Sequence, residues 1–204
     1  MKYFFLILFF PLLLFSQKFE SGIIAGLSTT QVSGDNYSGF NKFGPRVGLF
    51  INRKLDRINI QLELQYLTKG SKQNSNNSTQ NQSTNNNSLS LNDSYNFNLN
   101  YVGIPLLFSL KIHEKIKLEL GNAINILIKQ KEEVDFYEII SREVNRIESA
   151  ILIGIIYELN KNYHINIRGS NSIFPIRKHS SGEVYGLNRG QYNTGLSFNL
   201  LYKF

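Results

Sequence analysis

The chain has 204 residues, a length that fits one domain, and its content of 42% hydrophobic and 13% aromatic residues excludes a largely disordered protein. The formal net charge is +7, but Lys and Arg are spread along the chain without a nucleic-acid-binding motif, so we expect no nucleic-acid partner. The lack of cysteine excludes a disulfide framework, a thiolate metal site and a lipid-modified N-terminal cysteine.

Residues 1–17, MKYFFLILFFPLLLFSQ, have the three-part layout of a secretory signal peptide. Lys2 supplies the positive charge, and the apolar stretch that follows is interrupted by Pro11 and is short for a bilayer span. An uncleaved membrane anchor is the alternative. We therefore divide the chain into a signal peptide, residues 1–17, and one domain, residues 18–204, exported through the inner membrane.

The exported part alternates between apolar and polar residues. In RINIQLELQY, which starts at Arg57, every second residue is apolar, as in a strand with one apolar and one polar face. The same period occurs in KIKLELGNAINI from Lys115, in YHINIRGS from Tyr163 and in the closing GLSFNLLYKF. Eight strands are predicted in all, near residues 19–30, 43–53, 57–70, 95–111, 115–128, 148–159, 162–172 and 191–204.

The predicted connections alternate between short turns, such as KLDR and LNKN, and long loops. This pattern predicts an all-β protein, an eight-stranded antiparallel transmembrane β-barrel with short periplasmic turns and long extracellular loops. In hydrocarbon every backbone group must pair internally, so the last strand is expected to pair with the first. Its aromatic ending, with Tyr202 and Phe204, resembles the C-terminal signal that the outer-membrane assembly machinery recognises.

A soluble β-sandwich or a lipocalin-like barrel in the periplasm would show the same alternation. Such a fold turns its polar faces outward, where they are free to carry many charges. Here the polar faces are rich in Gly, Asn, Ser and Gln and carry fewer charges, which favours a crowded lumen inside a membrane barrel.

Several segments resemble the PorT-like outer-membrane β-barrel family, whose members are often labelled porin family proteins. They are SGIIAGLS, LELQYLTKGS and YVGIPLL, the last with Gly103 where the family usually has an acidic residue. These motifs are architectural, so the resemblance implies a barrel rather than an activity. One member of the wider family is associated with protein secretion and gliding, but no residue here points to that role.

Around YVGIPLL the apolar parity changes. Apolar residues share one parity from Tyr95 to Tyr101 and take the other from Val102 onward, which predicts an inserted residue or bulge near 101–103, next to Pro105.

The polar faces predict the contents of the lumen. Eight strands enclose a space that side chains can fill, whereas water-filled porins use 16 or more. The expected inward charges are Glu20, Arg46, Glu63, Lys117, Glu119, His164 and Arg168. Opposite charges in a narrow interior would pair to offset their desolvation, so we expect a plugged lumen, with a small-solute channel as the alternative.

Two loops are candidates for binding. Residues 71–88 form an Asn- and Ser-rich tract, interpreted as a tolerated insertion or a surface contact. The loop 173–190 contains Arg177, Lys178, His179 and Arg189, which would suit lipopolysaccharide phosphates if it faces outward; a solvated loop without a binding role is the alternative.

The sequence contains no recognisable catalytic motif. The only histidines are at 113, 164 and 179, and no nucleophile elbow, phosphate loop or HExxH sequence occurs. We expect no enzyme and no cofactor, although a lipid-modifying enzyme remains the alternative from another class. The expected partners are outer-membrane lipid, lipopolysaccharide, periplasmic chaperones and the assembly machinery, with the barrel as a monomer in an envelope or surface role.

Overall fold

The computed structural model describes residues 19–35, 37, 39–73, 94–140, 142–179 and 189–204. The predicted signal peptide and most of the Asn-rich tract lie outside these residues. Nine strands occur in the order β1 (Phe19–Ser33), β2 (Lys42–Leu55), β3 (Ile58–Gln73), β4 (Tyr95–Lys111), β5 (Ile116–Val134), β6 (Tyr137–Glu138), β7 (Ile147–Glu158), β8 (Tyr163–Ser172) and β9 (Tyr192–Lys203). Among the described residues, no helix has the length and apolar character to cross a membrane.

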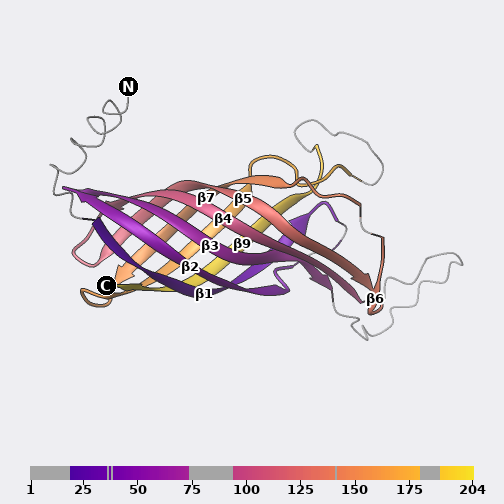
Figure 1. Ribbon diagram of the computed structural model, residues 1–204, viewed down its shortest axis with the longest axis horizontal. Coiled ribbons are helices and arrows are strands. Elements are labelled where there is room, and N and C mark those ends of the chain that lie inside the picture. The colour runs from indigo at the N-terminus through magenta and orange to yellow at the C-terminus, as the bar shows by residue number, and fades with distance from the viewer. Residues whose placement is uncertain (1–18, 36, 38, 74–93, 141, 180–188) are drawn as a thin grey trace, which may run out of the picture.

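Eight of these strands close into a ring. Each pairs antiparallel with its neighbours in the order β4-β3-β2-β1-β9-β8-β7-β5, and β4 pairs with β5 to complete the circle (Figure 1). The first and last strands pair from Gly22 with Lys203 to Ser33 with Tyr192. The predicted eight-stranded antiparallel barrel and its closure are therefore confirmed.

The two ends of the barrel differ. The start of β1, the C-terminus and the short connections β2–β3, β4–β5 and β7–β8 lie at one end, called the turn end below. The ends of β1, β3, β5 and β8 and the starts of β2, β4, β7 and β9 lie at the opposite end, called the loop end. The segment 129–147 was expected to be a loop, but β5 continues through it to Val134 and folds back as β6, so the wall of the barrel extends farther on this side (Figure 1).

The outer face of the barrel carries an apolar belt. Every second residue along the strands is a large exposed hydrophobic side chain, for example Leu27, Leu120, Ile153 and Phe198. The residues between them face the lumen, as the period of two requires. Most are small or polar, but two apolar clusters are buried among them: Ile24, Phe50 and Leu201, and Leu107, Ala123 and Leu152.

The parity change in β4 has a different cause from the predicted one. Burial alternates without interruption from Tyr95 to Ser109, and the β3–β4 register is regular, so β4 contains no extra residue. The irregularity lies across from it in β5, where Asn100 pairs with Lys129 and Tyr101 with Leu127, leaving Ile128 as the extra residue.

What changes along β4 is the environment of its apolar residues, whereas the register stays the same. In the belt, its apolar residues point outward to lipid, whereas toward the loop end they point inward and Asn side chains face out. The predicted irregularity therefore occurs at Tyr101, but its extra residue lies in β5 and not in β4. The parity change in β4 itself arises because its apolar residues switch from the lipid face to an interior core.

Candidate functional site: a filled lumen

A buried ion-pair network crosses the middle of the barrel. Arg168 on β8 donates from Nε and Nη2 to the Glu119 carboxylate on β5, at 2.7 and 3.0 Å. Its Nη1 and Nη2 donate to the Glu63 carboxylate on β3, both at 2.9 Å. All three side chains are at most 2% exposed. Because β3 and β8 are four strands apart in an eight-stranded ring, this contact joins opposite walls of the bore.

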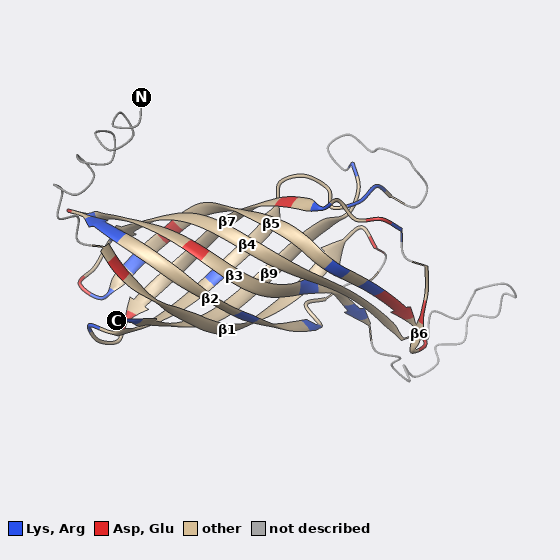
Figure 2. Cartoon of the chain, viewed as in Figure 1, with Lys and Arg blue, Asp and Glu red and all other residues tan. Residues whose placement is uncertain are grey.

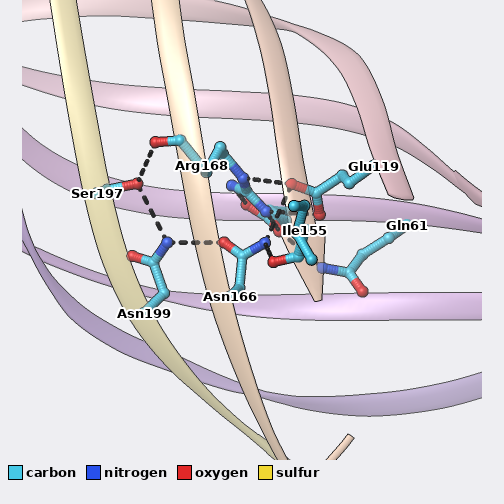
Figure 3. Close-up of polar contacts among 8 residues, drawn as sticks. Gln61, Glu119, Ile155, Asn166, Arg168, Ser197 and Asn199 are labelled. Carbon is cyan, nitrogen blue, oxygen red and sulfur yellow. Dashed lines mark hydrogen bonds and ion pairs between the residues drawn. The ribbon is translucent and has the colours of Figure 1, made fainter. Parts of the chain in front are cut away.

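Neutral side chains complete the bonding around the network (Figure 3). Gln61 donates to Glu63 at 2.7 Å, and Asn166 donates to Glu119 at 3.3 Å. Asn166 also accepts from Asn199 at 2.8 Å, and Asn199 donates to the Ser197 hydroxyl at 3.2 Å. Since buried charges are costly unless they are paired and hydrogen-bonded, this shell stabilises the central pair of carboxylates.

A second arginine lies beside the network. Arg46 on β2 is 2% exposed, and its Nε and Nη1 have no hydrogen-bond partner. Arg46 balances the charge of the network, because two arginines, Arg46 and Arg168, then face the two carboxylates of Glu63 and Glu119. Farther toward the loop end, Lys69 and Glu148 form another buried ion pair, at 2.6 Å.

The other three predicted luminal charges lie apart from this network, at the turn end. Lys117 pairs with Glu158 at 2.5 Å, and Glu20 pairs with Lys203 at 3.0 Å. These four side chains and His164 line a small cavity of about 40 Å³ on the turn-end side of the network. The structure thus brings Arg46, Glu63, Glu119 and Arg168 together, and places Glu20, Lys117 and His164 in a separate, more solvated layer.

An apolar plug fills the lumen on the loop side of the network. Its buried members come from three strands and two loops: Val32, Leu67, Tyr95, Phe97, Leu99, Tyr101, Val144 and Ile176. Val144 and Ile176 belong to the loops β6–β7 and β8–β9, which therefore fold over the end of the barrel. The sequence predicted that paired charges block the lumen, and the structure adds a hydrophobic core in this half of it.

Arg177 closes the plug. Its guanidinium carbon lies 4.3 Å from the centre of the Phe97 ring, and its Nη1 donates to Glu132 at 2.9 Å. Burial lowers the pKa of Arg177, but its hydrogen bonds to Glu132 and the charge of that carboxylate outweigh burial and raise it. The guanidinium therefore stays charged.

The structure places the four residues of the predicted anion-binding loop in different surroundings. Arg177 is 6% exposed and points into the barrel, because its charge is already matched by Glu132. Lys178 and Arg189 are exposed, and His179 is half-buried near Gly34. The four residues thus do not form one outward surface.

The comparisons with known proteins identify the family. A family model described as "Outer membrane protein beta-barrel domain" matches residues 15–178. The chain belongs to this family. Its place is the cell outer membrane, and the turn end corresponds to the periplasmic side of such barrels. The match is to the outer-membrane barrel domain in general, so the finer PorT-like resemblance stays a prediction.

Similar solved structures include one with a TM-score above 0.5, which shares the fold of this outer-membrane barrel. Neisserial surface protein A is 13% identical, with a TM-score of 0.54, over 90% of this chain and 97% of that chain. Ail of Yersinia pestis, in complex with the heparin analogue sucrose octasulfate, is 15% identical over 92% and 99% of the two chains, with a TM-score of 0.48. The N-terminal barrel domain of Pseudomonas aeruginosa OprF is 12% identical over 89% and 97%, with a TM-score of 0.39. No curated protein sequence matches the chain.

The C-terminal residues of the barrel are held on both sides. The backbone N–H of Lys203 donates to Asn162 at 2.7 Å, and that of Phe204 donates to Ser21 at 3.0 Å. The rings of Tyr202 and Phe204 meet edge to face, with centroids 5.7 Å apart. Of the two aromatic residues of the predicted assembly signal, Tyr202 therefore lies on the last strand and Phe204 directly after it, both at the turn end.

Sequence reasoning missed several functional side chains of the outer-membrane barrel. Lys69, Glu148 and Glu132 lie in or beside segments that were treated as strand ends or loops. Their inward parity is the signal that could have revealed them. Lys69 and Glu148 lie at the ends of the predicted strands 57–70 and 148–159, and Glu132 follows once β5 is extended toward the loop end. In the described part of the chain, no group of three or more His, Asp or Glu side chains is arranged to hold a metal ion.

Proposed function

We propose that this outer-membrane protein is a closed, non-conducting barrel without catalytic activity, which acts through its surface in an envelope or interaction role. The observation that carries this proposal is the contact of Arg168 with Glu63 and Glu119. A guanidinium that bonds carboxylates from two other strands fills the bore of an eight-stranded barrel, whose interior is only wide enough for side chains.

The apolar plug supports the same conclusion independently. Phe97, Leu99 and Tyr101 are fully buried in the loop half of the lumen, and Ile176 packs against them from above. A hydrated solute would have to displace both this core and the charged layer beneath it. A small-solute channel is therefore the less favoured reading, and no observation favours a lipid-modifying enzyme.

The proposed partners follow from the outer surface. The apolar belt suits outer-membrane lipid, with lipopolysaccharide in the outer leaflet, and the aromatic last strand suits the assembly machinery after delivery by periplasmic chaperones. We expect the barrel to be a monomer, since its ring of strands is closed and leaves no edge within the belt.

Planar-bilayer conductance of the full chain, purified from outer membranes, tests the closed lumen. Heat-modifiable gel mobility of the same sample confirms that the barrel is folded. We expect no steady current from the folded barrel. Stable, ion-selective steps would refute the proposal and show that the luminal charges line a path.

A further inference from the structure

The β5–β6 hairpin stands well outside the apolar belt. The last lipid-facing residue of β5 is Ile128, and the strand continues for six residues to Val134, roughly 20 Å along its length. At the usual strand tilt this is about 15 Å along the barrel axis. Above Ile128 the outer face is polar, with Lys129, Lys131 and Glu133. Figure 1 places β6 at the end opposite the C-terminus.

The tip of this hairpin is nevertheless apolar. Phe136 is 90% exposed, Tyr137 78%, Ile139 41% and Ile140 102%. Exposed hydrophobic residues in the belt face lipid, but these four lie beyond it in water. A cluster of large apolar side chains in a polar setting marks an interaction site.

The backbone of the turn adds an independent observation. Val134 pairs with Tyr137, so Asp135 and Phe136 form a two-residue turn, with φ of 50° and 67°. Such turns prefer Asn, Asp or Gly, and a bulky residue at positive φ is strained. Phe136 therefore stabilises neither the turn nor a core. Strain of this kind at an exposed position points to a function for the side chain itself.

The hairpin is held rigidly despite this strain. The backbone N–H of Asp135 donates to the Ser94 carbonyl at 2.9 Å, and its carboxylate accepts from the Ser94 N–H at 3.0 Å. Lys131 bridges Glu133 and Glu138, at 2.5 and 3.8 Å. A preformed surface loses little conformational freedom on binding, so the tip is organised to receive a partner.

We propose that the hairpin tip, defined as residues 135–140, is an extracellular docking site for a protein segment that combines apolar and basic side chains. The apolar partner residues would contact Phe136, Tyr137 and Ile140. Charge decides between occupants. The charged residues of the tip itself, Asp135 and Glu138, are both acidic, and Glu133 lies at its base together with the cations Lys131 and Lys72. The tip therefore attracts basic groups and repels the phosphates of lipopolysaccharide (Figure 2).

A cavity at the base of the hairpin fits such a partner. It measures about 510 Å³ and lies between the ends of β3, β4 and β5, with Phe136 at its edge. Glu133 and Asp135 line it together with Lys72, so a basic side chain entering it would meet two carboxylates and one cation. The cavity therefore offers the basic residue of the partner a place next to the apolar contact.

This inference rests on the proposed function only in that the barrel acts through its surface. The lumen and the tip are tested separately. A barrel that conducts but still binds at the tip would overturn the closed lumen alone.

The experiment uses the full chain in lipid nanodiscs and a displayed library of short random peptides. We expect the selected peptides to combine aromatic or aliphatic residues with Lys or Arg. The deciding variant is Phe136→Gly, which removes the side chain and relieves the turn. It should bind the selected peptides about tenfold more weakly or worse, while its resistance to urea equals or exceeds that of the wild type.

Two further variants sharpen the test. Phe40→Ser removes an exposed aromatic residue of the β1–β2 loop and should leave peptide binding unchanged. Glu138→Lys reverses one charge of the tip and should weaken binding several-fold at low salt.

Three outcomes would overturn the proposal. The first is that no peptide is selected, or that selected peptides are acidic. The second is equal binding by the wild type and by Phe136→Gly. The third is that Phe136 is needed instead for binding vesicles that contain lipopolysaccharide or for self-association of the barrel.

Discussion

Replacing Arg168 with Met tests whether the network across the bore holds the barrel together. The substitution keeps a side chain of similar length but removes four hydrogen bonds of 2.7–3.0 Å and leaves Glu63 and Glu119 buried without their cation. Removing one partner of a buried ion pair costs about 3–5 kcal/mol.

The structure places the expected loss near the lower end of that range. Glu63 keeps its hydrogen bond from Gln61 and Glu119 keeps that from Asn166. Arg46 lies next to both carboxylates and attracts them. We therefore expect Arg168→Met to lower the free energy of unfolding by about 3 kcal/mol. Combining it with Glu63→Gln and Glu119→Gln removes the buried charges and should restore most of that loss.

Equilibrium urea unfolding in lipid vesicles measures the difference. Far-UV circular dichroism is the suitable signal, because the chain contains no tryptophan. Arg53→Met, at an exposed site near the turn end, is the matched control and should change stability by about 0.5 kcal/mol or less. A loss under about 1 kcal/mol for Arg168→Met would refute the reasoning, as would a triple variant as unstable as the single one.

Two further predictions concern the loop half of the barrel. Phe97→Ala empties part of the apolar plug and removes the ring beneath Arg177, so it should cost about 3–5 kcal/mol in the same assay. The lipid-facing control Phe108→Ala should cost about 1 kcal/mol, and equal losses would contradict the assignment of a plug. Burial raises the pKa of Asp35 despite its hydrogen bonds from Ser71 and Tyr37. Its contribution to stability is therefore full below about pH 4 and is lost as pH rises through the raised pKa, so Asp35→Asn should gain stability relative to the wild type over that interval. Urea midpoints measured from acid to neutral pH check this, and a difference between the two proteins that does not vary with pH would contradict it.

Local pattern was sufficient to predict the strands that face lipid. In segments such as 58–66 and 195–204, a lipid face and a polar face impose a period of two on every residue, and the structure confirms these strands within a few residues. The inward side of Glu63, Glu119 and Arg168 followed from the same parity.

Prediction failed where the surroundings of a strand change along its length. From Tyr95 to Tyr101 the apolar residues turn inward to a core, and the sequence alone does not show where the belt ends, so the change was interpreted as a bulge. The anion-binding hypothesis for Arg177 depended on an outward-facing loop, and the sequence alone does not show where the side chain points. Its position follows from Phe97 and Glu132, which belong to other strands.

The sequence by itself thus determined the class of fold, the number of strands in the ring and the side of the residues within the belt, because these depend on neighbours one or two positions away. Only the tertiary structure decided which charges meet. Arg168 and Glu63 are 105 positions apart in the chain. They come together because eight tilted strands close into a ring narrow enough for opposite walls to touch, and that closure depends on the register of all the strands at once.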